Sequence, residues 1–199
     1  MRIAAFALLL LCTACWSPSY FAPREHADAT APGGMPAANY AVPTGASDAP
    51  PTAELRVWSN GAKARFTDDN REVVELHVGF ELENNSAIPL QLDLGAIAVE
   101  ELVLDGVLQK PLVPLHIAGD GLSLPKTTAR VDAIFEPGTT YPRHIDAFAV
   151  RFRVTGDGRE MLHQVTPFGP HVRSYDRYHD SGWGWGWGFG FGFAHTHWH

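Results

Sequence analysis

The sequence predicts an all-β protein, an immunoglobulin-like antiparallel β-sandwich of about seven to nine strands over residues 52–168. Three observations lead to this fold class. Apolar and polar residues alternate in many short segments, clusters of turn residues separate these segments, and no segment repeats its apolar residues at the helical spacing of about 3.6. Apolar residues make up 45% of the chain, and its two cysteines, Cys12 and Cys15, both lie near the start, so the domain must be held by its core rather than by disulfides.

The stretch from Glu72 to Leu94 is the clearest pair of strands. Apolar and polar residues alternate up to Asn84-Asn85-Ser86, which favours a turn, and the alternation then resumes. This pattern gives each strand one apolar and one solvated face, as in an antiparallel sheet that is covered on one side. The apolar positions are Val74, Leu76, Val78, Phe80 and Leu82 before the turn, and Ile88, Leu90, Leu92 and Leu94 after it.

Shorter strands are expected on both sides of this pair. Asp105-Gly106 predicts a two-residue hairpin turn, because these residues readily take positive φ angles. The prolines and glycines between Pro111 and Gly121 predict an edge strand or a loop. The other expected strands lie at 55–57, 62–66, 97–108, 127–135, 148–154 and 161–166, with turns at 59–61, 67–70 and 156–158.

A family resemblance accompanies this pattern. The run from Leu76 through Asn84-Asn85-Ser86 to Pro89-Leu90, with an extended stretch that closes near Phe135-Glu136-Pro137-Gly138, resembles the sandwich domains of the water-stress (late-embryogenesis-abundant) type. It is also similar to immunoglobulin-like modules of bacterial lipoproteins. The resemblance covers roughly half of the chain. It implies a sandwich fold and no catalytic residues.

Residues 1–14 form a predicted signal peptide. Met1-Arg2 precedes a short apolar run that cannot cross a bilayer as a helix. Thr13-Ala14-Cys15 then resembles the lipobox of bacterial lipoproteins, although Cys12 stands where leucine is usual. The resemblance implies that the leader is removed and that Cys15 carries a lipid. The alternative is an ordinary signal peptide that is cut after Ala14 and leaves Cys15 as a free thiol.

A lipid on Cys15 would hold the protein at a membrane, because several acyl chains make release very slow. Trp16, rather than Asp, follows the cysteine, which in the lipoprotein sorting rule implies the outer membrane of a bacterial cell envelope, facing either the periplasm or the cell surface. Residues 15–51 are rich in Ala and Pro and lack an apolar period, so they predict a disordered tether that spans about 30–36 Å. The tether is either a spacer or a neutral leader.

The end of the chain, residues 169–199, is a low-complexity tail in which aromatic residues alternate with glycine and histidines follow. Three interpretations stay open: a flexible tail, an adhesive strip that contacts the membrane interface, glycans or other copies, and a metal site for zinc, copper or nickel. The aromatic residues are Trp183, Trp185, Trp187, Phe189, Phe191 and Phe193, and the metal ligands would be His195, His197 and His199.

The net charge of −7 argues against nucleic acid as a partner. We find no nucleophile elbow, zinc-protease motif or phosphate-binding loop. Glu75, His77, Glu81 and Glu83 share one face of a predicted strand, which is a metal site or a solvated sheet face, and Asp68-Asp69-Asn70 is a calcium site or a turn. We therefore expect no enzyme. The sequence favours a membrane-anchored envelope lipoprotein whose sandwich binds an envelope protein or a glycan, or else a metal-binding envelope protein that uses the C-terminal histidines.

Overall fold

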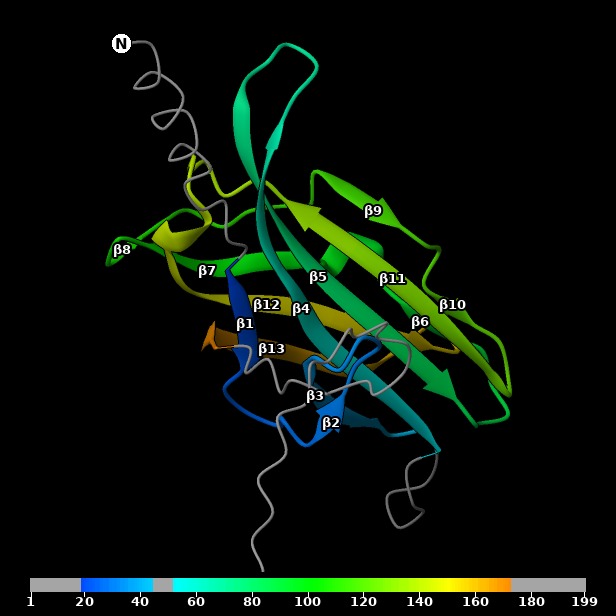
Figure 1. Cartoon of the computed structure of the whole chain (residues 1–199). Helices are drawn as coiled ribbons and strands as arrows, with labels where there is room; N and C mark the ends of the chain where they lie inside the picture. Colours follow the sequence, from blue (N-terminus) through cyan, green and yellow to red (C-terminus); the bar gives the residue numbers. More distant parts are fainter. Residues whose placement is uncertain (1–18, 45–51, 173–199) are drawn as a thin grey trace, which may run out of the picture.

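A computed structural model describes residues 19–44 and 52–172 of the chain. Two antiparallel sheets pack face to face, which confirms the predicted β-sandwich (Figure 1). The six-stranded sheet contains, in order, β2 (Ala29–Thr30), β3 (Pro36–Val42), β4 (Ala53–Phe66), β5 (Glu72–Asn84), β11 (Thr127–Phe135) and β9 (His116–Ala118).

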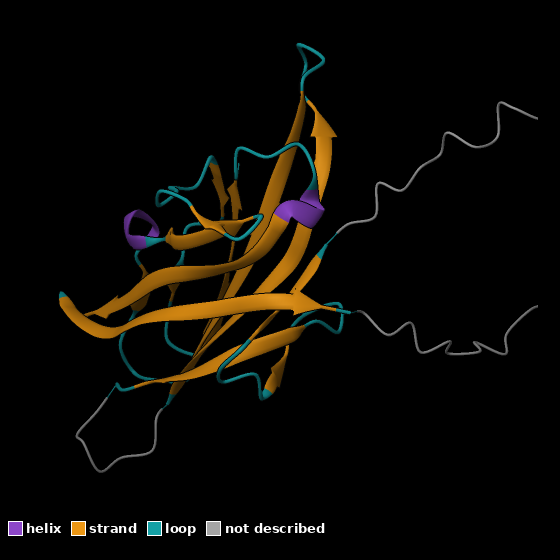
Figure 2. Cartoon of the chain, turned by 90° about the vertical axis from the view of Figure 1, so that its left-hand side faces the viewer, coloured by secondary structure: helices purple, strands orange, loops and turns teal. Residues whose placement is uncertain are grey.

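The seven-stranded sheet forms the second layer. Its strand β12 is central, because it pairs with β13 on one side and with both β6 and β7 on the other. Figure 2 shows the two layers of strands, with the short 3₁₀ helices η1 (Leu94–Ala96) and η2 (Pro142–His144) on their connections. The strands of this sheet are β1 (Tyr20–Pro23), β13 (Arg159–His171), β12 (Ile145–Gly156), β6 (Leu90–Leu92), β10 (Leu122–Ser123), β7 (Ala98–Leu104) and β8 (Val107–Leu108).

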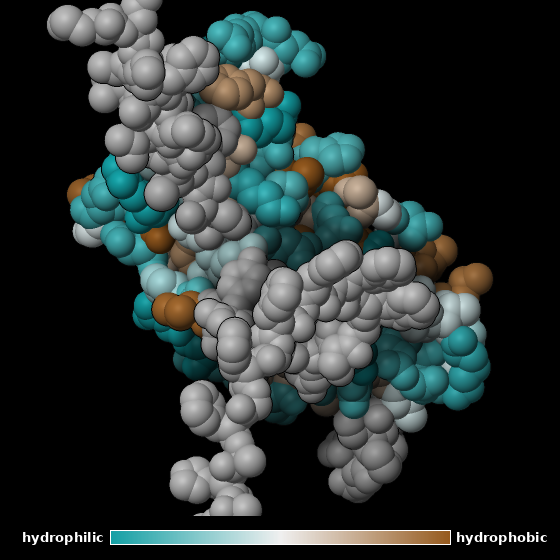
Figure 3. All heavy atoms as spheres, in the orientation of Figure 1, coloured by the Kyte–Doolittle hydropathy of each residue, from teal (hydrophilic) through white to brown (hydrophobic). Residues whose placement is uncertain are grey.

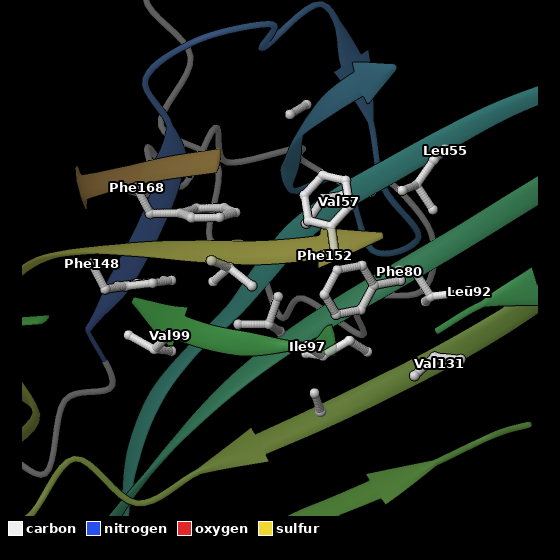
Figure 4. Packing of buried hydrophobic residues seen from close by; sticks show 14 of the residues in the cluster. Leu55, Val57, Phe80, Leu92, Ile97, Val99, Val131, Phe148, Phe152 and Phe168 are labelled. Atoms are coloured by element: carbon white, nitrogen blue, oxygen red, sulfur yellow. The ribbon is translucent and has the colours of Figure 1, made fainter. Parts of the chain in front are cut away.

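The core lies between the sheets and contains the alternating residues that the sequence singles out. Val74, Leu76, Val78 and Phe80 of β5 are all fully buried. Phe152 of β12 meets Phe80 across the core, with ring centroids 5.8 Å apart (Figure 4). Burying one large apolar side chain is worth about 1.5–3 kcal/mol, so these strands supply much of the stability of the fold.

The predicted hairpin turn at Asp105-Gly106 is confirmed. Asp105 has a φ of 48° and Gly106 a φ of 75°, and the turn joins β7 to β8. The turn after β5 is also present and has a buried anchor. The Asn84 side-chain amide donates to the carbonyl oxygens of Ile88 (2.8 Å) and Ser123 (2.9 Å), and its oxygen accepts from the Ser86 backbone N–H (2.9 Å).

The turn predicted at 59–61 is wrong, because β4 runs through these residues without reversing. The pairing of β4 with β5 instead shifts register between Ser59 and Gly61, which makes a β-bulge. Gly61 has a φ of 91°, and a Cβ atom there would lie 2.6 Å from the Ser19 carbonyl oxygen. Glycine is therefore needed at position 61 because the backbone of Ser19 passes close to it, and not because the chain forms a hairpin there.

The disordered tether predicted for residues 15–51 is wrong for residues 20–42, which form β1, β2 and β3. Phe21 is 1% exposed and packs edge-to-face on Phe148, with ring centroids 5.1 Å apart. Tyr40 is also buried, and its hydroxyl is 2.8 Å from the Thr166 hydroxyl. β3 pairs with β4 and β1 pairs with β13, so the segment is held by backbone hydrogen bonds to both sheets. A few large buried side chains are then enough to fix it in the core. The sandwich thus begins before residue 52, and its last strand ends at His171 rather than at 168.

Candidate functional site

The outer face of the six-stranded sheet, the side turned away from the core, carries the polar residues of the alternating strands. Glu75, His77 and Glu81 of β5 all point to this face, as do their cross-strand neighbours on β4 and β11. Figure 3, in the orientation of Figure 1, shows mostly hydrophilic residues over the described part of this face.

A row of ion pairs crosses the outer face from β4 to β11. The two carboxylate oxygens of Glu81 accept separately from Arg56 (2.7 Å) and Arg130 (2.6 Å), and the Glu81 side chain is only 7% exposed. A second guanidinium nitrogen of Arg56 reaches Glu83 at 3.2 Å. Because arginines already occupy both oxygens of Glu81, this carboxylate acts as a clamp between three strands.

His77 lies in a second polar group, nearer the start of β5 than Glu81. Glu75 pairs with Arg65 at 2.6 Å, and its other oxygen is 3.5 Å from the Nε2 atom of His77. Burial and the positive charge of Lys63 lower the pKa of His77, although the charge of Glu75 acts in the opposite direction. His77 is therefore a neutral imidazole at neutral pH, which can donate one hydrogen bond and accept another.

A hollow of about 500 Å³ opens on the outer face beside His77. The β2–β3 turn forms one wall, and β11 contributes Asp132 at the opposite side. The hollow is lined by Tyr20, Pro32, Gly33, Met35, Asn60, Lys63, His77 and Asp132.

Trp58 supports the wall of the hollow that the β2–β3 turn provides. Its indole lies over Gly79, where a Cβ atom would be only 2.3 Å from the ring. Trp58 is 4% exposed, packs in a small apolar cluster with Met35 and Ala37, and donates from Nε1 to Asn60 Oδ1 at 3.0 Å. The absence of a side chain at Gly79 thus lets Trp58 lie flat and hold the turn in place.

The hollow brings together an ammonium group, a carboxylate, a neutral imidazole and an amide. It can therefore donate to and accept from a small polar ligand. Of its residues, the sequence singles out only His77. For the other lining residues, the sequence offers one signal: Gly79 stands where the alternation of β5 calls for a polar side chain. The structure places the bulky Trp58 of β4 directly opposite this glycine.

The structure answers one of the alternatives that the sequence left open. Asp68-Asp69-Asn70 is the turn between β4 and β5, where Asn70 has a φ of 61° and Asp69 pairs with Arg71 at 2.6 Å. Within 19–44 and 52–172, no group of three or more His, Cys, Asp and Glu side chains is placed to bind a metal ion. Helices in the same ranges are all too short or too polar to cross a membrane.

The other predicted site residues lie outside the described residues and stay predictions. They are Cys15, the aromatic residues from Trp183 to Phe193, and the histidines at 195, 197 and 199. The structure does place the points at which the chain enters and leaves the sandwich. Tyr20 of β1 pairs with His171 of β13, so these two points are neighbours at one end of the seven-stranded sheet.

Comparison with protein-family models, curated proteins and solved structures finds no match to this chain. The roles of its residues therefore follow from geometry and chemistry alone.

Proposed function

We propose that this protein is a non-catalytic, membrane-anchored lipoprotein of the bacterial outer membrane whose β-sandwich binds an envelope partner through the hollow on its outer face. The anchor is Cys15, by the lipobox-like sequence Thr13-Ala14-Cys15. The binding part is carried by one observation, the hollow in which Lys63, His77 and Asp132 come together from three paired strands.

A glycan is the partner that this hollow favours. Lys63 and Asp132 are opposite in charge, so together they give no preference for an anion or a cation, whereas sugar hydroxyls both donate and accept hydrogen bonds. Tyr20 adds ring surface for the C–H face of a sugar ring. A volume of about 500 Å³ lies within the range of small-molecule sites.

Calorimetry with soluble peptidoglycan fragments tests the binding proposal. We expect Lys63→Met and Asp132→Asn each to weaken binding about tenfold, because a hydrogen bond to a charged group is worth about 1.5–3 kcal/mol. Lys110→Met is the matched control, since Lys110 is exposed and does not line the hollow. No heat from the parent protein, or equal losses for Lys63→Met and Lys110→Met, would refute the glycan site.

A separate experiment tests the anchor. Cells that express the full chain are fed a clickable fatty acid, and the label on the parent protein is compared with that on Cys15→Ala. We expect the label to be lost in the variant. Equal labelling of the two proteins would show that Cys15 is not the acylated residue.

A further inference from the structure

A second hollow, of about 400 Å³, lies on the outer face at the end of the sheet where β5 ends and β11 begins. Glu54 and Arg56 of β4 and Glu83 of β5 line it, and Asn85 and Lys126 come from the neighbouring turns. Its volume lies within the range of small-molecule sites. Like the first hollow it combines an ammonium group, carboxylates and an amide, so it can both donate to and accept from a polar ligand.

Lys126 is held in the second hollow by its backbone. It has a φ of 65° in the turn between β10 and β11, and its N–H donates to the Asn84 carbonyl oxygen at 2.8 Å. Its ammonium group donates to the Asn85 carbonyl oxygen. Because an ammonium group carries three hydrogens, Lys126 can still donate to a ligand from this fixed position.

Glu54 provides an acceptor on the other side of the second hollow. Its side chain is 47% exposed, and its contacts within the protein are long, at 3.5 Å to Asn39 and 3.7 Å to Arg56. The Glu54 carboxylate therefore gives up little when it accepts a hydrogen bond from a ligand.

Outward side chains of β11 connect the two hollows. Asp132 lines the first hollow and Lys126 the second, and the exposed side chains of Arg130 and Thr128 alternate between them on the same face. Six residues of strand span about 20 Å. Arg130 donates to Glu81 through Nε, yet its side chain is 64% exposed, so its other guanidinium nitrogens can donate to a ligand. A track of polar groups thus runs beside β5 from one hollow to the other, along the length of the sheet that Figure 1 shows.

The length of this track indicates what kind of ligand it fits. A single sugar ring can fill one hollow, whereas only several linked rings can reach from one hollow to the other. A chain that is held in one hollow binds the other as an intramolecular step, which raises the affinity without any further contact.

We propose that the two hollows are subsites of one binding surface, which holds an extended stretch of a polymeric glycan along β11 rather than a single sugar or a chain end. This inference rests on the proposed glycan site in the first hollow, and it adds the length and the course of the ligand.

Calorimetry with peptidoglycan fragments of two lengths tests the second subsite. The probes are a disaccharide and a glycan strand of several disaccharides, both free of peptides. We expect the parent protein to bind the strand about tenfold or more tightly than the disaccharide. Lys126→Met should remove most of this difference and leave the affinity for the disaccharide unchanged, whereas Lys63→Met should weaken the binding of both probes.

Glu54→Gln is a second variant of the same subsite, needed because Lys126 also contacts the turn at Asn85. It keeps the shape of the side chain and should weaken the binding of the strand alone. Lys110→Met is the matched control, since Lys110 is exposed and lines neither hollow.

Equal affinities of the parent protein for the two probes would overturn the second subsite and leave the first hollow as a glycan site. The same conclusion would follow if neither Lys126→Met nor Glu54→Gln weakened the binding of the strand more than Lys110→Met does. No heat with either probe would refute the proposed glycan site and this inference together.

Discussion

Gly79→Ala is the sharpest test of how the hollow is built. The new Cβ atom would lie 2.3 Å from one carbon of the Trp58 indole and 2.4 Å from another, whereas ordinary contacts begin at 3.4 Å. The indole must therefore move by more than about 1 Å. It has little room to do so, because it is 4% exposed and packed against the β2–β3 turn.

Two opposing terms set the magnitude. Overpacking costs about 1–3 kcal/mol, whereas replacing a strand glycine by alanine gains about 0.5–1 kcal/mol by lowering the entropy of the unfolded chain. We expect a net loss of about 1–2 kcal/mol in the free energy of unfolding. For a domain of this size that loss corresponds to a fall in Tm of about 3–8 °C.

Urea denaturation followed by circular dichroism measures the effect, and a double-mutant cycle with Trp58→Phe gives it a cause. The smaller ring leaves space at Gly79, so Gly79→Ala should cost much less in the Trp58→Phe background, with a coupling energy of about 1 kcal/mol. If Gly79→Ala is as stable as the parent protein, or loses as much stability with phenylalanine at 58, the contact does not constrain the wall.

Three further predictions concern the core, pH and metal binding. Phe21→Ala should lower the free energy of unfolding by about 3–5 kcal/mol, whereas the exposed control Val172→Ala should not change it; equal stabilities would mean that β1 is not part of the core. His77 has a lowered pKa in the folded protein, so it contributes stability that is present above about pH 6.5 and lost as the pH falls through its folded pKa. His77→Gln should flatten that part of the pH–stability curve, measured by urea denaturation; identical curves for the parent and His77→Gln would contradict this. Calorimetry with zinc, copper and nickel, on the full chain and on a chain truncated after Phe193, decides between the metal site and the other interpretations of the tail: heat with the full chain alone would support the histidine site, and equal, negligible heats would remove it.

The period-two pattern identifies the strands because successive side chains of a strand point to opposite faces. That rule by itself assigns Phe80 to the core and Glu81 to the outer face, and both residues lie there. It cannot pair Glu81 with its arginines, which lie 25 residues before it and 49 residues after it. Only the register of β4, β5 and β11 brings these three residues together.

The error in the N-terminal segment has a related cause. Composition is an average over a window, and the few large residues of 20–42 are diluted by alanine and proline. Burial depends instead on whether single residues meet a partner. Phe21 does so against Phe148, because β13 offers β1 a free edge to pair with. No local property of residues 20–23 indicates that the edge of β13 is available for pairing.

The sequence by itself determined the layered β architecture, the buried sides of β5, β11 and β12 and the tight hairpin at Asp105-Gly106, since each of these depends on neighbours along the chain. Only the tertiary structure decided that Gly61 makes a bulge rather than a turn, that Trp58 lies over Gly79 beside the hollow, and that Tyr20 and His171 meet at one corner. These features arise where distant segments touch, and the energy of such contacts is fixed by strand register and close packing, which are not properties of any short window of sequence.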